Sequence, residues 1–453
     1  MLDRDSLKLL AAALERLDAG FAELPQFVAR PTDRDLMVKV LAAAADRLQD
    51  NYPYFHPLYA GQMLKPPHPV AQMVYALAQW INPNNHAIDG GRATSAMEKE
   101  AVAGIARMFG WEEHLGHLCG GGTMANLEAL WAAGQLAPDK RILASEQAHY
   151  THRRISGVLK LPFTSVPCDA QGRMDLAKLQ EELERGDVGT VVVTMGTTAT
   201  GSIDPLAEIL ELRERHGFRV HADAAYGGYF LLAGNLAEAT RHHFDLLCRV
   251  DSIVIDPHKH GLQPYGCGCV LFRDPGVGQL YKHDSPYTYF SSRELHLGEI
   301  SLECSRAGAA AAALWATQEL LPLTKGGEFA RRLDDCRTAA LDLYGRLRAD
   351  DRFIAAFPPE LDIVIFAPRA ASASEASERA RLIFNAAAGK NLHLALAQLP
   401  VAFLGANLGA MKRDRETIRY LRSVLMKPEH KDWIGRIWEL LSEATDQMQP
   451  FSN

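Results

Sequence analysis

A lysine lies at the end of an apolar segment in the middle of the chain. The segment DSIVIDPHKHG predicts a strand over 251–257, which places Asp256, His258 and Lys259 at its carboxyl end before Gly261 permits a turn. A lysine amine attacks a carbonyl only when it is deprotonated, and a desolvated position favours that state by lowering the lysine pKa. Lys259 is therefore a candidate nucleophile. A structural lysine is the alternative for this residue taken alone.

A carboxylate comes at the end of an earlier apolar segment, FRVHADAAYGGY. Asp223 follows the strand expected there, and a buried carboxylate needs a cationic partner. The pyridine nitrogen of pyridoxal phosphate (PLP) is such a partner, because it is protonated when paired with an aspartate, and the protonated ring stabilises a carbanion. The small residues Ala224 and Ala225 leave room for a flat ring. An aspartate that caps the next helix is the alternative.

Three consecutive glycines suggest a phosphate site. Gly120, Gly121 and Gly122 lead into a helix expected from Thr123, and the free N–H groups at a helix start bind anions. The segment lacks the lysine of a P-loop, and no GxGxxG follows the first strand, which argues against a Rossmann oxidoreductase. We therefore expect a single phosphate group here.

Two further segments place polar side chains after strands. His149 follows the strand expected at 141–146, where an imidazole could stack on a cofactor ring, although a surface histidine is the alternative. Thr197 and Thr198 follow the strand expected at 189–196, and their hydroxyls could donate to the cofactor's phenolate oxygen or its phosphate.

The elements that carry these residues alternate between apolar runs and helices. This alternation predicts an α/β fold with a mostly parallel sheet, in which ligands bind at the carboxyl ends of the strands. The clearest strands are expected at 141–146, 189–196, 218–224 and 251–257, with a further and perhaps antiparallel strand at 266–272.

The organisation along the chain suggests three parts. Residues 1–95 are expected to form a helical arm and substrate segment, irregular over 51–85, and residues 96–327 to form the large cofactor-binding domain. Residues 328–453 are expected to form a smaller α/β domain with a strand at 361–368.

Taken together, the DPHK box, HADAAYGG, SEQAHY and GGTMANLEAL resemble the group II pyridoxal-dependent amino acid decarboxylases, which include aromatic amino acid, tyrosine, histidine and glutamate decarboxylases. The resemblance runs from about His56 into the C-terminal domain. It implies the aspartate aminotransferase-like fold (PLP-dependent transferase fold type I) with flanking helices. It also implies a homodimer with shared active sites and loss of the substrate's α-carboxylate as CO₂.

The resemblance also assigns roles to residues. Lys259 would carry PLP as a Schiff base, Asp223 would pair with the pyridinium and His149 would stack on the ring. Many members have Asn at the position of Asp256, and an acidic group near phosphate is repulsive unless it is protonated or turned away. The expected cofactor-binding set comprises Lys259, Asp223, Ala225, His149, Gly122, Thr123, Met124 through its backbone N–H, Thr197, Thr198, His258 and Asp256.

In this family a loop after the lysine supplies a tyrosine that helps to protonate the substrate carbon. The corresponding stretch, YKHDSPYTYFSSRELHLGEISLECSR, offers Tyr287 and Tyr289 as candidate catalytic residues. In plant relatives a phenylalanine at the loop position diverts the reaction toward an aldehyde. If Phe290 aligns there, oxidative deamination becomes an alternative.

Substrate contacts are expected from the early segment NYPYFHPLYAGQM, which resembles the family's pocket-lining stretch and contains Phe55, His56 and Tyr59. Core packing explains such aromatic residues equally well. Arg306 is either a clamp for a carboxylate or phosphate or a member of a structural ion pair.

The segment HGLQPYGCG resembles microbial tyrosine decarboxylases and favours an aromatic substrate such as L-tyrosine. A glutamate, aspartate or cysteine sulfinate substrate would need a second cation, for which Arg92 is the candidate. A carbon–carbon lyase and a non-catalytic PLP-binding protein are further alternatives.

Composition narrows the class of protein. The 453 residues are 47% hydrophobic and carry a net charge of -7, so we expect a globular protein with a small-molecule partner and no affinity for nucleic acid or anionic lipid. The seven cysteines lack zinc-site spacing, which predicts reduced thiols and no metal. The first residues resemble neither a signal peptide nor a membrane span, so a cytoplasmic location is expected.

Overall fold

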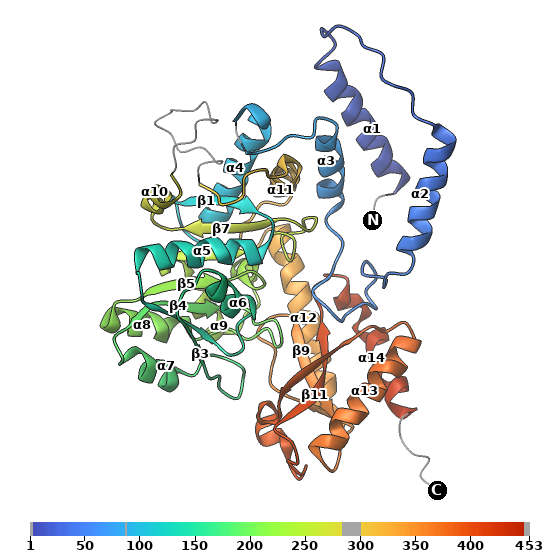
Figure 1. The fold of residues 1–453 in the computed structure, drawn as a ribbon. Coiled ribbons are helices and arrows are strands. Elements are labelled where there is room, and N and C mark those ends of the chain that lie inside the picture. The colour runs from blue at the N-terminus through green and yellow to red at the C-terminus, as the bar shows by residue number, and fades with distance from the viewer. Residues whose placement is uncertain (1–2, 87, 283–299, 448–453) are drawn as a thin grey trace.

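The computed structural model describes residues 3–86, 88–282 and 300–447, which contain two β-sheets (Figure 1). The larger sheet has seven strands in the order β1-β7-β6-β5-β4-β2-β3. Its strands are β1 (Leu115–Cys119), β2 (Arg141–Ser145), β3 (Phe163–Val166), β4 (Val188–Thr194), β5 (Arg219–Asp223), β6 (Ser252–Ile255) and β7 (Gly268–Phe272).

The sheet is mostly parallel, as the sequence predicts. Neighbouring pairs from β3 through β2, β4 and β5 to β6 run parallel, whereas β7 runs antiparallel to both β6 and β1. Parallel strands covered on both faces need continuous apolar runs, and Val191, Val192 and Val193 of β4 are fully buried. Burying each such side chain stabilises the fold by about 1.5–3 kcal/mol.

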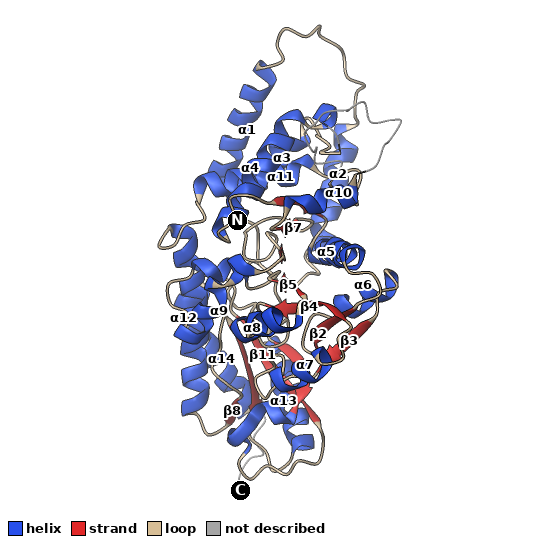
Figure 2. Ribbon diagram, turned by 90° about the vertical axis from the view of Figure 1, so that its left-hand side faces the viewer, coloured by secondary structure: helices blue, strands red, loops and turns tan. Residues whose placement is uncertain are grey.

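Helices cover both faces of this sheet, and the last of them connects it along the chain to the second sheet (Figure 2). They are α4 (Arg92–Met108), α5 (Gly122–Leu136), α6 (Thr151–Val158), α7 (Leu176–Leu183), α8 (Leu206–His216), α9 (Glu238–Asp245), α10 (Gly278–Tyr281), α11 (Gly308–Leu320) and α12 (Glu328–Ala349). α12 extends from the large sheet to the C-terminal part of the molecule (Figure 1).

The smaller sheet is antiparallel and lies in the C-terminal part. Its order is β10-β11-β9-β8, formed by β8 (Phe353–Ala355), β9 (Ile363–Pro368), β10 (Ala395–Pro400) and β11 (Thr417–Val424). Helices α13 (Ala373–Gly389) and α14 (His430–Asp446) pack with it around a core that includes Leu343, Phe366 and Ile437.

The N-terminal part holds α1 (Arg4–Ala19), α2 (Arg34–Leu48) and α3 (Pro69–Gln79). Neither α1 nor α2 contains a buried residue in the single chain. Helix α3 corrects the expectation of irregular structure across 51–85: His68 caps it by accepting from the Val70 N–H (3.3 Å), and Pro69 takes the first helical position, where its missing N–H has no cost. Of the helices within the described residues, none is long and apolar enough to cross a membrane.

Candidate active site

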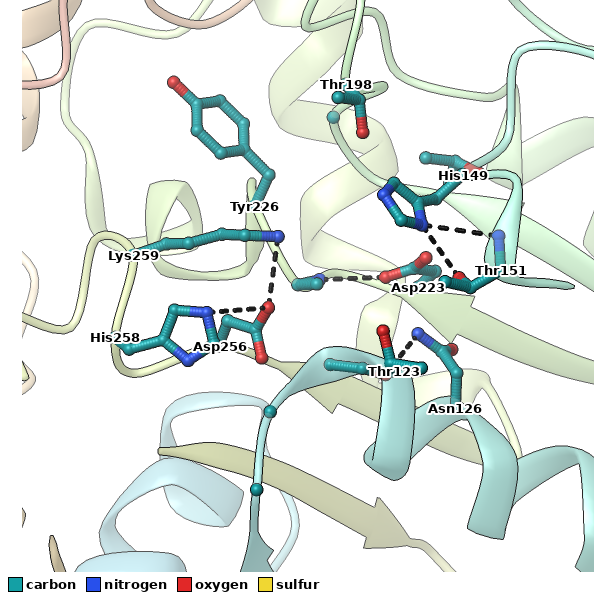
Figure 3. A pocket seen from close by; sticks show the side chains of 16 residues that line it. Thr123, Asn126, His149, Thr151, Thr198, Asp223, Tyr226, Asp256, His258 and Lys259 are labelled. Carbon is teal, nitrogen blue, oxygen red and sulfur yellow. Dashed lines mark hydrogen bonds and ion pairs between the residues drawn. The ribbon is translucent and has the colours of Figure 1, made fainter. Parts of the chain in front are cut away.

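A cavity of about 280 Å³ opens at the carboxyl ends of β4, β5 and β6, next to the start of α5 (Figure 3). Open α/β sheets bind ligands at this edge, because the chain leaves parallel strands there and helix N-termini converge on it. The cavity is lined by Gly120, Gly121, Gly122, Thr123, Asn126, His149, Thr151, Thr194, Gly196, Thr198, Asp223, Ala225, Tyr226, Asp256, His258 and Lys259.

Lys259 enters the cavity from the turn after β6, and its amine faces Asp256. The Lys259 Nζ lies 3.1 Å from Asp256 Oδ2, and His258 Nε2 lies 3.5 Å from the same oxygen. The His258 ring also contacts the Cys267 carbonyl through Nδ1 at 2.9 Å. Asp256 is only 2% exposed, so these two neighbours rather than solvent contact its carboxylate. Asp256 was expected to be repelled by a phosphate unless it is protonated or turned away. In the structure this carboxylate contacts the Lys259 amine.

Asp223 reaches the cavity from the end of β5 with a histidine already bound to it. The Nε2 of His152 lies 2.8 Å from Asp223 Oδ2, and the Ala225 N–H donates to Oδ1 at 3.2 Å. Burial alone would raise the Asp223 pKa, but the hydrogen bond and charge of His152, with the charge of Lys259, outweigh it and hold the pKa well below its usual range. Asp223 is thus ionised and can accept a hydrogen bond from a protonated ligand nitrogen.

Sequence reasoning missed His152. The spacing offered only a weak signal, because SEQAHYTHRR places His152 three residues after His149, but His149 precedes α6 and the two rings do not share a helix face. The partner on β5 could not be read from that spacing.

His149 lines the cavity close to Asp223 (Figure 3). Its Nδ1 lies 2.8 Å from the Thr151 hydroxyl, which fixes the orientation of the ring. Burial lowers the His149 pKa, so the imidazole is neutral near pH 7. A neutral, oriented ring at this place can stack on a flat heterocycle.

The glycine turn before α5 approaches the opposite wall very closely. Gly121 has φ +135°, a conformation that favours glycine, and a Cβ on Gly122 would lie 2.6 Å from Asp256 Oδ2. The start of α5 is therefore held against the end of β6, and Gly122 and Thr123 line the cavity there. Asn126 Nδ2 donates to the Gly122 carbonyl at 2.9 Å and stabilises the turn from within the helix.

Of the two threonines after β4 that were expected to contact the cofactor, Thr197 lies outside the cavity wall. Thr197 is fully buried, its hydroxyl lies 2.6 Å from that of Thr200, and it accepts from the Ser202 N–H at 3.1 Å. It therefore stabilises its own loop, whereas its neighbour Thr198 lines the cavity. The Met124 side chain packs partly buried against the β1, β6 and β7 cluster, and the expected contact of its backbone N–H stays a prediction.

The expected substrate residues Phe55, His56 and Tyr59 do not line the cavity of the single chain. The His56 ring packs against Trp433 at 4.9 Å, and the Tyr59 ring packs against Tyr54 at 4.9 Å. Phe55 is half exposed. These contacts fit the alternative of aromatic packing for His56 and Tyr59.

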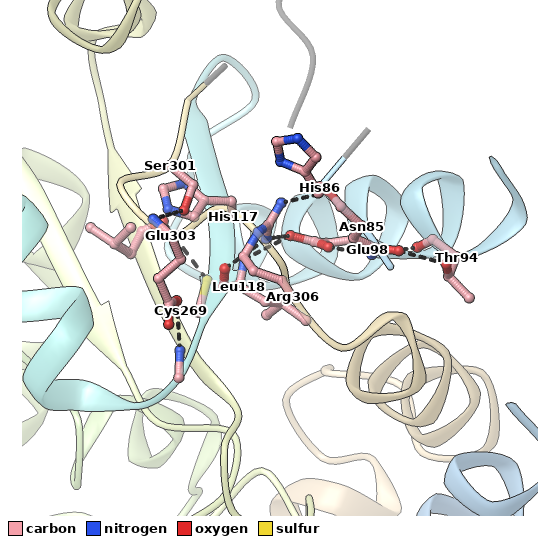
Figure 4. A network of polar contacts seen from close by, with 12 residues as sticks. Asn85, His86, Thr94, Glu98, His117, Leu118, Cys269, Ser301, Glu303 and Arg306 are labelled. Atoms are coloured by element: carbon pink, nitrogen blue, oxygen red, sulfur yellow. Dashed lines mark hydrogen bonds and ion pairs between the residues drawn. The ribbon is translucent and has the colours of Figure 1, made fainter. Parts of the chain in front are cut away.

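Arg306 forms the structural ion pair and not the clamp. Its guanidinium binds the buried carboxylate of Glu98 and donates to the Leu118 carbonyl at 2.8 Å (Figure 4). Asn85 Nδ2 donates to the other Glu98 oxygen at 2.6 Å. This network ties α4, β1 and the segment before α11 together, and Arg306 lies outside the cavity wall. Arg92, the candidate second cation, is exposed at the start of α4.

A second group that sequence reasoning missed joins the C-terminal part to the cavity. Tyr226 lines the cavity, and its hydroxyl donates to Asp362 Oδ1 at 2.5 Å. His260, the residue after Lys259, lies 3.2 Å from the other Asp362 oxygen through Nε2. Asp362 is fully buried just before β9, so one carboxylate holds both a wall residue and the neighbour of the lysine.

The candidate loop residues Tyr287 and Tyr289, and Phe290 with them, lie outside the described residues.

The cavity suits PLP by the chemistry of its donors. The glycine turn and helix start can bind a phosphate, Asp223 can bind a protonated pyridine nitrogen, and Lys259 supplies an amine. Two buried polar atoms of the cavity residues, Thr194 Oγ1 and Asp256 Oδ1, have no hydrogen-bond partner among the described residues. Such atoms indicate a polar ligand.

Comparisons with known proteins agree with this chemistry. A family model described as the pyridoxal-dependent decarboxylase conserved domain matches residues 51–369. A probable L-tyrosine/L-aspartate decarboxylase of Methanothermobacter thermautotrophicus is 30% identical over 322 residues, which cover 70% of this chain and 85% of the relative. The L-tyrosine decarboxylase of Enterococcus faecium is 27% identical over 395 residues, and this match covers 65% of each chain.

The fold comparison covers almost the whole molecule. The crystal structure of Oryza sativa TDC with PLP and tryptamine matches with a TM-score of 0.79 and 20% identity, over 99% of both chains. Such a match shows the shared fold, PLP-dependent fold type I, as expected from the sequence. With a family match over most of its length and this fold, the chain belongs to the pyridoxal-dependent decarboxylases and is a PLP-dependent amino acid decarboxylase.

Proposed function

We propose that this decarboxylase acts on an aromatic L-amino acid, with L-tyrosine as the first candidate. The observation that carries the proposal is the charge of the cavity wall: of the described residues that line it, Lys259 is the only lysine or arginine. An acidic substrate brings a second carboxylate, which needs its own cation when it leaves water. A phenol side chain needs none. The names of both relatives include L-tyrosine.

In this proposal each side chain around the cavity has a separate role in the reaction. PLP, when bound, accepts the electrons of the bond broken at Cα. The Asp223 carboxylate keeps a proton on the ring nitrogen, and His152 keeps that carboxylate ionised and oriented. The Lys259 amine would hold the cofactor as a Schiff base and would be released when the substrate amine binds in its stead. His149 would stack on the cofactor ring and exclude water from it.

Orientation selects the bond that breaks. The bond to the carboxylate must stand perpendicular to the cofactor ring, so the residues that hold the substrate decide between decarboxylation and other reactions. Tyr287 or Tyr289 is the proposed proton donor to Cα.

A panel of L-amino acids tests the substrate. Purified enzyme is assayed with tyrosine, phenylalanine, tryptophan, aspartate, glutamate and cysteine sulfinate, and CO₂, amine, ammonia and peroxide are measured for each. The proposal expects CO₂ and amine in equal amounts, with tyrosine the most efficient substrate. Turnover of aspartate or glutamate above that of every aromatic amino acid would contradict it.

The same assay separates the alternatives. The Methanothermobacter relative's name includes L-aspartate, which keeps an acidic substrate as the second candidate. Ammonia and peroxide together with CO₂ would indicate an aldehyde-forming enzyme. Cleavage of a carbon–carbon bond without CO₂ release would indicate a lyase of another kind on this fold.

A homodimer is the proposed assembly. Its support is the exposed apolar surface of the N-terminal segment, where Leu9 of α1 is 64% exposed and Phe27 and Val28, between α1 and α2, are 87% and 97% exposed. Exposed apolar surface of this extent is typical of protein interfaces.

A further inference from the structure

A second cavity lies where the N-terminal segment, the large sheet region and the C-terminal part of the chain meet. Its volume is about 400 Å³, and it shares no lining residue with the cofactor cavity. Its wall includes Lys65, His68, Leu262, Arg332, Lys427 and Glu429. We call it the junction cavity.

Among the described residues, neither lysine of the junction cavity binds a carboxylate, although Lys427 is buried and Lys65 is half-buried. Lys427 is 3% exposed, and its Nζ donates to the Tyr59 carbonyl at 2.7 Å. Lys65 Nζ donates to the Met426 carbonyl at 3.3 Å. Among the described residues these carbonyls are their only hydrogen-bond acceptors, whereas an ammonium has three donors. Both ammonium groups therefore retain donors for an anion.

Burial disfavours the charged forms of Lys65 and Lys427 when no anion is bound. Desolvation, with the charge of Lys65 second, lowers the Lys427 pKa to about 7, and desolvation also lowers the Lys65 pKa. An anion between two such groups would offset their repulsion and favour their charged forms.

Arg332 adds a third cation from α12. Its Nη2 donates to Glu328 Oε1 at 2.8 Å, but its Nε is buried without an acceptor among the described residues. Of the described residues that line the cavity, Glu429 is the only one with a carboxylate. The described wall therefore carries three lysine or arginine side chains and one carboxylate, with Glu328 bound to Arg332 beside it.

We propose that the junction cavity binds a small oxyanion, a phosphate or a carboxylate, separately from the phosphate of the cofactor. The ligand would bridge Lys65 of the N-terminal segment, Arg332 of α12 and Lys427 after β11. It would thus join three parts of the chain. Leu262 in the same wall lies three residues after Lys259, and its carbonyl accepts from the His68 N–H at 2.9 Å.

The experiment uses the cofactor-loaded enzyme after borohydride reduction, so that the phosphate site of the cofactor stays filled. Inorganic phosphate and, separately, acetate are titrated by calorimetry in a buffer of low ionic strength, and the thermal unfolding midpoint is followed in parallel. The variants are Lys65→Met and Arg332→Gln. Lys431→Met is the matched control, because that lysine is half exposed on α14, pairs with Asp335 and lies outside the cavity wall.

The proposal expects saturable binding of at least one of the two anions, near one per chain, and a rise in the unfolding midpoint with anion concentration. Lys65→Met and Arg332→Gln should each weaken binding by about tenfold or more, whereas Lys431→Met should not. If Lys65→Met fails to fold, Arg332→Gln decides, since its side chain is 32% exposed. Absence of saturable binding for both anions, or equal affinity in all variants, would overturn the proposal.

Discussion

At the scale of single residues, the contact between Asp223 and His152 prepares the cavity for its cofactor. Both side chains are buried, and the imidazole keeps the carboxylate charged where burial alone would neutralise it. An aspartate that must bind a protonated ring nitrogen has to be ionised beforehand. His152 therefore acts on the chemistry through Asp223 and is a positioning residue.

Replacing His152 tests this dependence. In His152→Leu the buried carboxylate loses its partner, and breaking a buried pair typically costs about 3–5 kcal/mol of unfolding free energy. Urea unfolding of the cofactor-free chain at pH 7 measures the loss. His152→Gln, which keeps an N–H donor, is the control and should lose clearly less. Equal losses in the two variants would speak against the role of the hydrogen bond.

The same pair predicts a pH dependence. The Asp223 pKa in the folded chain lies below its value of about 3.9 in the unfolded chain, so the unfolded state binds more protons between these two values. The stability that the pair contributes is thus fully present above about pH 4 and is lost as the pH falls through the folded pKa. The stability difference between wild type and His152→Leu should shrink on acidification to about pH 3. A difference that stays constant would contradict the assignment.

At the scale of elements, the meeting of the glycine turn with the end of β6 shapes the phosphate end of the cavity. A Cβ on Gly122 would come within 2.6 Å of the Asp256 carboxylate, which itself lies 3.1 Å from the Lys259 amine. The close approach of this buried side chain to the turn is the reason for glycine here.

Gly122→Ala should therefore weaken cofactor binding by about tenfold or more, as a loss of about 1.4 kcal/mol or more in binding energy. Titration of the cofactor-free protein with PLP, followed by visible absorbance, measures the change. Gly157→Ala on α6 is the matched control, because an added Cβ meets nothing within 4 Å. It should leave binding unchanged and stabilise the helix by roughly 0.4–1 kcal/mol. Unchanged affinity in Gly122→Ala would show that the turn tolerates a side chain.

Strand ends were the part of the site that the sequence predicts best. Apolar runs followed by Asp223 and Lys259 indicate both the strands and the side of the sheet where they end, and the structure brings these residues into one cavity. Adjacent residues such as Thr197 and Thr198 are not separable by pattern, because only the loop conformation decides which hydroxyl turns inward.

Contacts between segments far apart in the chain could not be predicted from the sequence for a different reason. The bonds of Asp362 to Tyr226 and His260 join β9 to two segments of the large sheet region, and nothing in the local pattern encodes that pairing. Helix α3 was missed because the surrounding prolines and asparagines suggest a loop, although His68 and Pro69 form a regular helix start.

At the scale of the whole molecule, the N-terminal helices expose apolar side chains in the single chain. Leu36 and Val40 of α2 are 56% and 58% exposed, and α2 contains no buried residue. Residues four apart form one face of a helix, which suits a second copy of the chain.

Charged substitutions on that face test the proposed dimer. Leu36→Asp with Val40→Asp should shift the sedimentation mass from that of two chains toward the 49.9 kDa of one, because burying unpaired carboxylates opposes association. Val158→Asp, at a position 68% exposed on α6, is the control and should leave the mass unchanged. A full-length protein that sediments as one chain, or a double variant that still forms dimers as tightly as wild type, would contradict the assembly.

The assignment of Lys259 as the residue that holds the cofactor is the claim on which the others depend. Its most direct test is borohydride reduction of the PLP-loaded enzyme, followed by protease digestion and mass spectrometry of the peptides. A single pyridoxyl group on Lys259, absent from Lys259→Ala, is the predicted result. A pyridoxyl group on another lysine, or none on any, would contradict the account.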